Sequence, residues 1–448
     1  MNLSDLTLEL EQALSEVPIL DIHTHLIGGK LGARGLHDVL LYHMAISDLY
    51  GAGCPTGKRL TEYPHFPTDQ EAHARIQEAL PYFAKVQNTS TSWGIRILLK
   101  DLYNWTEPIT ADNWRRLDAM IRERADDRGW HHSILDRVNI KRTGTEIARR
   151  GNGEEDERFQ YALEWGFFTR CQWGEFDTAL YELESCWGNS PLSSPSPIGA
   201  GGRAPTKHSI HTVDDLREAV HYYVSSIPYD KVISTATHIS TDIRFQEVSD
   251  SEFANALSRR SEAGPAQRDI YASYVNHAFL TELEKHGHEI VLQFSFAAEP
   301  LPFETASRVS QESIAQIATM IGRHPKLRFQ CFLANVAANQ SMCTLARELP
   351  NFSLAGYWWH NFFPDAIRTV MSERLDMLPL NKQVGFFSDA YVVEWTYAKV
   401  VMVRRIMAQV LARRIDQGQY SREDAVTIAR AILFESPQTL LGMKPKVS

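Results

Sequence analysis

The chain has 448 residues, 44% of them hydrophobic, so it can bury a large core in one enlarged domain or in two or three smaller ones. Its formal net charge is −9 and it has no run of basic residues, which argues against nucleic acid as a partner. The chain lacks an export signal near its start and any apolar run approaching roughly 18 residues, which predicts no membrane partner and a cytoplasmic location. Its five cysteines have no metal-binding or redox spacing and are expected to be reduced thiols.

The first elements place a histidine pair at the end of a strand. Residues 1–16 predict a short helix with Ser4 as its N-cap. The apolar run 17–22 predicts one buried strand, and His23 and His25 follow directly. Side chains two residues apart on an extended chain project to the same side, so both imidazoles can reach one metal ion.

The rest of the chain predicts alternating strands and helices. Residues 28–130 indicate a helical insertion that lies over one end of a domain spanning 17–448. Further strands are expected at 134–140, 167–173, 231–239, 289–296, 327–332, 352–359 and 383–387. Helices are expected between them at 213–226, 252–260, 269–285 and 310–323. Eight strands in this alternation predict a (β/α)8 TIM-type barrel. A doubly wound open sheet is the alternative, but the first strand is not followed by the glycine-rich phosphate turn of that fold.

Two segments are interpreted as structural. Residues 190–207 are rich in Pro, Ser and Gly, which predicts a mobile surface loop; a lid over the site is the alternative. A second histidine pair, His286 and His288, flanks Gly287 at the end of a predicted helix. Glycine is common just beyond a helix C-terminus, so this pair is interpreted as a basic helix end.

Asp389 supplies the second half of a candidate metal site. It follows the last predicted strand and precedes a long predicted helix over 394–414. In a (β/α)8 barrel the first and last strands are neighbours, and chemistry concentrates at their carboxyl ends. Two histidines and one aspartate would hold a metal and leave positions open for water or substrate. The alternative is that Asp389 only caps the following helix.

These motifs together resemble the amidohydrolase superfamily and, within it, the uronate isomerases. The resemblance rests on the order and spacing of several segments: His23-Thr24-His25, Ala236-Thr237-His238, Leu292-Gln293-Phe294, residues 356–361, Ser388-Asp389 and residues 396–399 followed by Arg404-Arg405. It extends loosely over residues 17–442 and identifies the chain as a divergent member.

The resemblance implies an aldose–ketose isomerase that moves a proton between C2 and C1 of a hexuronate such as D-glucuronate or D-galacturonate. It implies one divalent metal, zinc or alternatively manganese, held by His23, His25 and Asp389. Asp389 would also serve as catalytic base, with the Tyr42 hydroxyl as its partner acid. Contacts to the small sugar-acid substrate are implied for Arg170, Trp359, His238, Lys399 and Arg142.

The chain also departs from the family pattern. Leu41, Tyr391, Ser295 and Thr439 stand where the family has histidine or arginine, so the exact substrate stays open. One alternative is a metal-dependent hydrolase of a lactone, amide or ester, in which Asp389 would shuttle the proton of a metal-bound water. Ser295 offers no metal ligand on the fifth strand, which favours one metal and weakens that alternative. A non-enzymatic ligand-binding barrel is disfavoured because all three metal-type residues are present. A homo-oligomer is compatible with the sequence.

Overall fold

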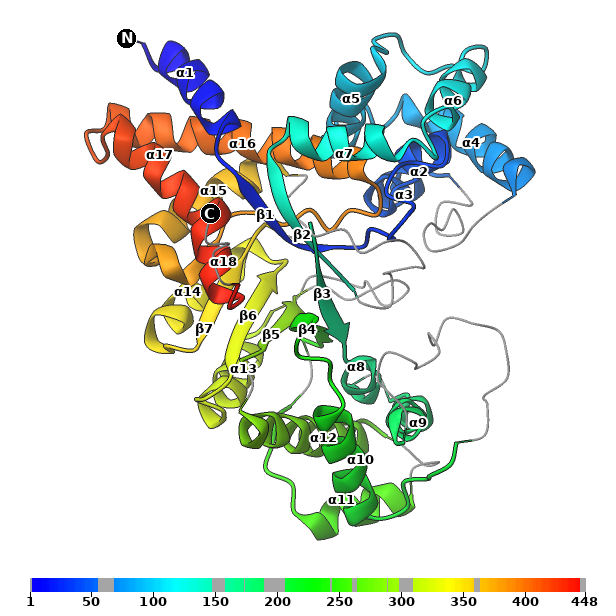
Figure 1. The fold of residues 1–448 in the computed structure, drawn as a ribbon, viewed down its shortest axis with the longest axis vertical. Coiled ribbons are helices and arrows are strands. Elements are labelled where there is room, and N and C mark those ends of the chain that lie inside the picture. The colour runs from blue at the N-terminus through cyan, green and yellow to red at the C-terminus, as the bar shows by residue number, and fades with distance from the viewer. Residues whose placement is uncertain are drawn as a thin grey trace.

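The fold is a parallel sheet of eight strands surrounded by helices (Figure 1). The computed structural model describes residues 2–54, 68–146, 158–172, 174–188, 206–241, 244–259, 264–287, 289–297, 309–357 and 363–443. The strands are β1 (Ile19–Thr24), β2 (Ile140–Glu146), β3 (Phe159–Glu164), β4 (Val232–Ile239), β5 (Val291–Phe296), β6 (Arg328–Leu333), β7 (Phe352–Ala355) and β8 (Gln383–Val384). Each pairs in parallel with the next in chain order, which confirms the predicted (β/α)8 class.

The two edge strands meet at their carboxyl ends. Just beyond β8, the Asp389 amide donates to the His23 carbonyl and the His25 amide donates to the Ala390 carbonyl, each over 2.9 Å. The Ser388 amide donates instead to the side chain of Asp21, over 2.8 Å to Oδ1. A carboxylate therefore takes the place of a backbone acceptor where the sheet curls round on itself.

Between β1 and β2 the described residues form six helices: α2 (Leu36–Leu40), α3 (His43–Gly51), α4 (Asp69–Phe83), α5 (Ser90–Tyr103), α6 (Trp114–Arg122) and α7 (Arg128–Arg137). After β3 follow α8 (Gly166–Gln172), α9 (Phe176–Cys186) and α10 (Val213–Ser225), and after β4 follow α11 (Asp250–Ser258) and α12 (Pro265–His286). The later helices are α13 (Gln311–Arg323), α14 (Asn339–Glu348), α15 (Pro364–Met377), α16 (Val393–Asp416), α17 (Arg422–Arg430) and α18 (Ser436–Leu440). The described residues also form short 3-10 turns at Val336–Ala338 and Leu380–Lys382 and a π-helical turn at Ala431–Glu435.

Two strand predictions are wrong. The run 134–140 mostly belongs to α7, whose buried His131, Ile134 and Leu135 have helical spacing. The run 167–173 lies on α8 as far as Gln172, so the preceding segment 159–164 is the third strand. Short apolar runs fit a buried helix as well as a strand, and tertiary packing decides between them.

The N-terminal cap of the first helix differs from the prediction, whereas the end of α12 agrees with it. Helix α1 (Leu3–Ser15) is capped by Asn2, whose side chain accepts a hydrogen bond from the Asp5 amide, rather than by Ser4. Helix α12 ends at His286, and Gly287 takes a left-handed φ of 73° as its cap. The reading of this histidine pair as a helix end is confirmed for His286. His288 and most of the 190–207 loop lie outside the described residues.

The cysteines lie in the packed core as free thiols. The five cysteines are buried and form no disulfide. None of the helices in the described part of the chain has the length and apolar character needed to cross a bilayer.

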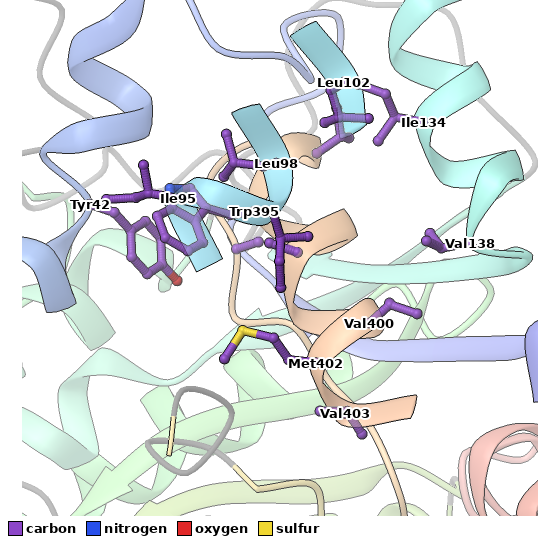
Figure 2. Close-up of a cluster of buried hydrophobic side chains, with 14 of the residues drawn as sticks. Tyr42, Ile95, Leu98, Leu102, Ile134, Val138, Trp395, Val400, Met402 and Val403 are labelled. Atoms are coloured by element: carbon purple, nitrogen blue, oxygen red, sulfur yellow. The ribbon is translucent and has the colours of Figure 1, made fainter. Parts of the chain in front are cut away.

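The helices after β1 pack against the long helix α16, which starts just after Asp389. Figure 2 shows Ile95 and Leu98 of α5 beside Trp395 of α16, in one buried hydrophobic cluster. The Trp395 indole donates to the carbonyl of Val39 over 3.2 Å. A Cβ on Gly94 would lie 2.8 Å from the Trp395 ring, so a glycine is needed for α5 to approach this closely.

A buried carboxyl reinforces the same junction. Glu394, in the first turn of α16, is fully buried and accepts hydrogen bonds from the Tyr103 hydroxyl over 2.8 Å and the Ala33 amide over 3.0 Å. Burial raises the pKa of Glu394 to about 7, although these two hydrogen bonds oppose the shift. One side chain thus ties α16 to α5 and to the segment after β1.

We predict that this carboxyl makes the stability of the fold depend on pH. Because the pKa of Glu394 rises from 4.5 to about 7 on folding, the folded protein retains a proton that the unfolded chain releases between these values. The free energy of unfolding therefore falls as pH rises from about 4.5 to about 7. In Glu394→Gln the side chain is neutral at every pH, so its free energy of unfolding does not fall for this reason. Between these pH values the variant should therefore gain about 3 kcal/mol of stability relative to the unmodified protein. Urea unfolding at about pH 5 and about pH 8 measures the difference, and an equal difference at both pH values would contradict the assignment.

Candidate metal centre at the mouth of the barrel

Three side chains converge at the carboxyl ends of β1 and β8. His23 is the second-to-last residue of β1, His25 comes directly after this strand, and Asp389 lies a few residues beyond β8. Asp389 Oδ1 lies 3.0 Å from His25 Nε2 and 3.5 Å from His23 Nε2. The structure therefore brings the three predicted metal ligands together; they are called the metal-type trio below.

The geometry of this trio fits a metal ion. One ligand atom from each residue lies within 4.8 Å of the other two. Ligands bonded to a tetrahedral zinc at about 2.1 Å stand roughly 3.4 Å apart, so small side-chain shifts would bring all three into range. Two imidazole nitrogens and one carboxylate oxygen form a donor set that suits zinc or another divalent transition metal.

The backbone at Asp389 is held in an unusual conformation. Its φ is 53°, in the left-handed region that residues other than glycine rarely adopt. The Tyr42 hydroxyl donates to the Asp389 carbonyl over 2.6 Å. Lys399 of α16 donates both to the Tyr42 hydroxyl, over 3.0 Å, and to the Ser388 carbonyl. These bonds fix the turn that aims the Asp389 carboxylate at the two histidines.

The charges at the mouth favour an ionised aspartate beside a protonated histidine while no metal is bound. Burial would raise the pKa of Asp389, but hydrogen bonds from His23 and His25 and the nearby positive charges hold it well below its usual range. Burial would lower the pKa of His25, but the carboxylates of Glu146 and Asp389 outweigh it and raise the pKa to about 9. A metal bound here would displace the proton from His25.

Two further residues at this mouth were not expected from the sequence. Glu146, the last residue of β2, is buried, and its Oε1 lies 3.1 Å from His25 Nδ1. His43, at the start of α3, places Nε2 3.9 Å from Asp389 Oδ2. Burial lowers the pKa of His43 to about 3, so its imidazole is neutral near pH 7.

Aromatic rings line the metal-type residues. Tyr391 stacks on His25, with ring centroids 4.7 Å apart and an interplanar angle of 21°. Phe332 and Phe387 pack beside His23, with ring centroids 5.3 Å and 6.0 Å away. A Cβ on Gly356 would lie 2.0 Å from the Phe387 ring, so the absence of a side chain there makes room for this packing. The rings restrict the orientation of both imidazoles.

His238 lies at the end of β4, as expected. Gln172 of α8 fixes this strand end: its amide nitrogen donates to the His238 carbonyl over 2.8 Å, and its oxygen accepts from the Ser240 amide over 2.7 Å. Burial, followed by the charge of His23, lowers the pKa of His238 to about 4. A neutral imidazole thus lies within electrostatic reach of the metal-type trio.

Three other residues expected at the site, Tyr42, Lys399 and Arg170, bond to other protein groups. Tyr42 and Lys399 are buried supports of the turn at Asp389, as their hydrogen bonds show. Arg170 lies on helix α8 rather than at a strand end, and it forms ion pairs with Glu175, over 2.8 Å, and with Glu182. The predicted substrate roles of these residues are not tested by their positions.

The Arg142 backbone lies far from the mouth of the barrel. Arg142 pairs with Leu20 in the sheet and lies four residues before Glu146, so its Cα is roughly 13 Å from the strand end. The register therefore does not bring the Arg142 backbone to the mouth. Trp359 lies outside the described residues.

The fold and the site together define a (β/α)8 barrel with three potential metal ligands, His23, His25 and Asp389, at its mouth. No known family profile matches the chain. In sequence it is similar to the uronate isomerase of Thermotoga sp. (strain RQ2), with 20% identity over 115 residues. That match covers 26% of this chain and 26% of the relative, about a quarter of the relative's length.

Solved structures resemble the chain over nearly its whole length. Glucuronate isomerase from Caulobacter crescentus superposes with a TM-score of 0.79 at 14% identity, covering 99% of this chain and 95% of that one. Uronate isomerase from Thermotoga maritima gives a TM-score of 0.74 at 12% identity, with 98% and 97% covered. A putative metal-dependent hydrolase from Lactobacillus casei gives 0.60 at 14% identity, with 98% and 99% covered. The chain thus has the fold of the uronate isomerases, and the predicted resemblance is confirmed at this level.

We predict that Lys399 supports metal binding through the turn at Ser388–Asp389. Lys399→Met keeps the length of the side chain but leaves the Ser388 carbonyl and the Tyr42 hydroxyl without their lysine partner. Loss of such buried bonds should lower stability by about 1–3 kcal/mol, and the loosened turn should weaken zinc binding by about tenfold or more. Zinc affinity measured by competition with a chelator, together with urea unfolding, checks both effects.

Lys382→Met is the matched control. Lys382 also donates to three carbonyls, those of Leu349, Pro350 and Phe352, but at the amino end of β8. This variant should lose stability without losing zinc affinity. Equal losses of zinc affinity in both variants would show that Lys399 acts only through general stability.

Proposed function

We propose that the protein is a metal-dependent aldose–ketose isomerase that acts on a hexuronate, D-glucuronate or D-galacturonate, or a related sugar acid. The observation that carries the proposal is the convergence of His23, His25 and Asp389 at the mouth of a barrel with the fold of the uronate isomerases. The partial sequence match to a uronate isomerase supports the same reaction class. The negative net charge and the absence of a bilayer-spanning helix among the described residues are compatible with work on a small molecule in the cytoplasm.

His23, His25 and Asp389 would hold one divalent metal, with zinc expected and manganese as the alternative. When bound, the metal polarises substrate oxygens and so makes the neighbouring C–H more acidic. Asp389 is buried, His23 and His25 are partly buried, and the rings of Tyr391, Phe332 and Phe387 pack beside them, so water at the reacting carbons would be limited.

The isomerisation needs a group that removes a proton from C2 and returns it to C1 through an enediol. Asp389 is ionised and buried, and its Oδ2 points toward His43, 3.9 Å away. We assign the carbon-to-carbon transfer to the Asp389 carboxylate. The neutral imidazole of His43 is suited to accept and return the hydroxyl proton. Tyr42, initially expected as the partner acid, donates to the Asp389 carbonyl and would act by holding that base in place.

The carboxylate tail of the substrate needs donors near the mouth. We propose that His238 contributes a hydrogen bond and that Arg170 contributes charge. Trp359 is kept as a substrate contact on the family resemblance alone. Arg170 would have to exchange one of its glutamate partners for the substrate carboxylate, since both Glu175 and Glu182 now pair with it. Arg142 and Lys399 are weaker candidates because of their distance from the strand end and their buried bonds, respectively.

A mononuclear metal-dependent hydrolase of a lactone, amide or ester is the second candidate. The likeness to the Lactobacillus casei protein favours it, although that TM-score is lower than those of the isomerases. Ser295, which pairs with His238 across β4 and β5, offers no nitrogen for a second metal. In this reading the same three residues hold the metal, and Asp389 handles the proton of the attacking water.

The direct test is a substrate screen with metal analysis. Protein supplied with zinc or manganese should hold about one ion per chain and convert D-glucuronate or D-galacturonate to the corresponding ketose, detected by chromatography. A lactone and ester panel, run in parallel, should show no turnover. The His23→Ala/His25→Ala double variant should lose both metal and activity. Full metal occupancy in that variant would disprove the site, and hydrolysis without ketose formation would favour the second candidate.

Asp389→Asn tests the proposed base separately. The amide has the size of the carboxylate and can still bind a metal weakly through its oxygen, but it cannot take up a proton. At saturating metal, kcat should therefore fall by about 10²–10⁴. A kcat within a few-fold of the unmodified protein would exclude Asp389 as the base.

A further inference from the structure

The imidazole of His25 lies between two carboxylates from different strands. Its Nε2 is 3.0 Å from Asp389 Oδ1, after β8, and its Nδ1 is 3.1 Å from Glu146 Oε1, at the end of β2. Glu146 has only 8% of its surface exposed, so this contact is shielded from solvent. The two nitrogens face opposite sides of the ring, which places Glu146 behind the histidine as seen from the metal-type trio.

A histidine that binds a metal must be neutral, with its one ring proton on the nitrogen away from the metal. If Nε2 of His25 faces the metal, the proton must lie on Nδ1, which faces Glu146. A carboxylate that accepts this proton stabilises the required tautomer, fixes the ring orientation and makes the ligating nitrogen more basic. Tyr391 stacks on one face of the His25 ring, which restricts the rotation of the imidazole further.

We infer that Glu146 is a positioning residue that fixes the tautomer and orientation of His25 for metal binding. The inference rests on the proposed metal centre but not on the identity of the substrate. Glu146 is not among the residues whose ligand atoms converge in the described part of the chain, and its near oxygen contacts the nitrogen on the far side of the ring. It therefore acts through His25 rather than by touching the metal or the substrate.

The strand itself explains how Glu146 reaches this place. β2 pairs with β1 in parallel, and Thr145 lies opposite Thr24, between the two histidines of the pair. The Thr24 hydroxyl donates to the Gly144 carbonyl over 2.8 Å, and the Thr145 hydroxyl donates to the Leu26 carbonyl over 2.8 Å. These two buried bonds lock the end of β2 to the segment that carries His25.

The test compares Glu146→Gln with Glu282→Gln. Both replace a carboxylate by an amide of the same shape, and both carboxylates contact a histidine Nδ1, since Glu282 Oε1 lies 2.7 Å from His221 Nδ1 on the helical surface. Zinc affinity is measured by chelator competition on the full chain. Glu146→Gln should bind zinc about 10–100-fold more weakly, and Glu282→Gln should match the unmodified protein.

A second readout separates positioning from a general loss of structure. In the zinc-loaded protein, the ¹⁵N resonances of His25 should show a protonated Nδ1 and a metal-bound Nε2, and Glu146→Gln should shift the Nδ1 proton resonance. Thermal unfolding without metal checks that the variant folds. Unchanged zinc affinity in folded Glu146→Gln would overturn the inference. A complete loss of zinc, as in His25→Ala, would overturn it in favour of direct ligation. Absence of zinc from the unmodified protein would refute the proposed metal centre itself.

Discussion

The left-handed turn at Asp389 is the constraint on which the site depends. A residue with a Cβ at φ 53° is strained by an amount of order 1–3 kcal/mol, and it persists only where surrounding bonds over-determine it. Here the Asp389 amide is held by His23, its carbonyl by Tyr42, and the preceding carbonyl by Lys399. In this conformation the Asp389 carboxylate lies 3.5 Å from His23 Nε2 and 3.0 Å from His25 Nε2. The backbone strain at Asp389 thus accompanies a fixed arrangement of the three potential metal ligands.

The helices inserted after β1 give this turn its support. Tyr42 comes from the segment between α2 and α3, and its ring stacks on Trp395 of α16, with centroids 4.7 Å apart. Lys399 lies one helical turn beyond Trp395 on the same helix. The α5 helix packs against α16 at Gly94, and Glu394 ties both helices to the segment after β1. The insertion therefore acts on the metal-type site through the start of α16.

The sequence predicted those parts of the fold and site that depend on local pattern. The first strand, its histidine pair, the long helix after Asp389 and the four helices between later strands have clear periodicity, and the (β/α)8 class followed from their alternation. Residues 142–146 resemble a strand end of the family, but with the second strand placed at 134–140 no role was assigned to Glu146. With β2 at its observed 140–146, Glu146 ends the strand and would have been expected at the mouth.

Other contacts depend on three-dimensional packing that a single sequence does not encode locally. His43 is one residue from Tyr42, yet only the approach of α3 to the end of β8 brings it near Asp389. Arg170 was read as a strand-end residue, but α8 is a helix because its aromatic residues Phe167 and Phe168 are buried among neighbouring helices and rings. Its glutamate partners lie 5 and 12 residues later in the chain, and nothing in the local pattern indicated these pairs.

We propose that the site formed by His23, His25 and Asp389 moves a proton between adjacent carbons of a sugar acid. The most direct measurement is the reaction of a hexuronate with the metal-loaded protein in deuterated water, followed by NMR of the product. We expect deuterium at the C1–C2 carbons and nowhere else, or internal proton transfer between these carbons with slow exchange. Cleavage of a lactone, amide or ester without any exchange at carbon would contradict the isomerase, and it would assign the same three residues to hydrolysis.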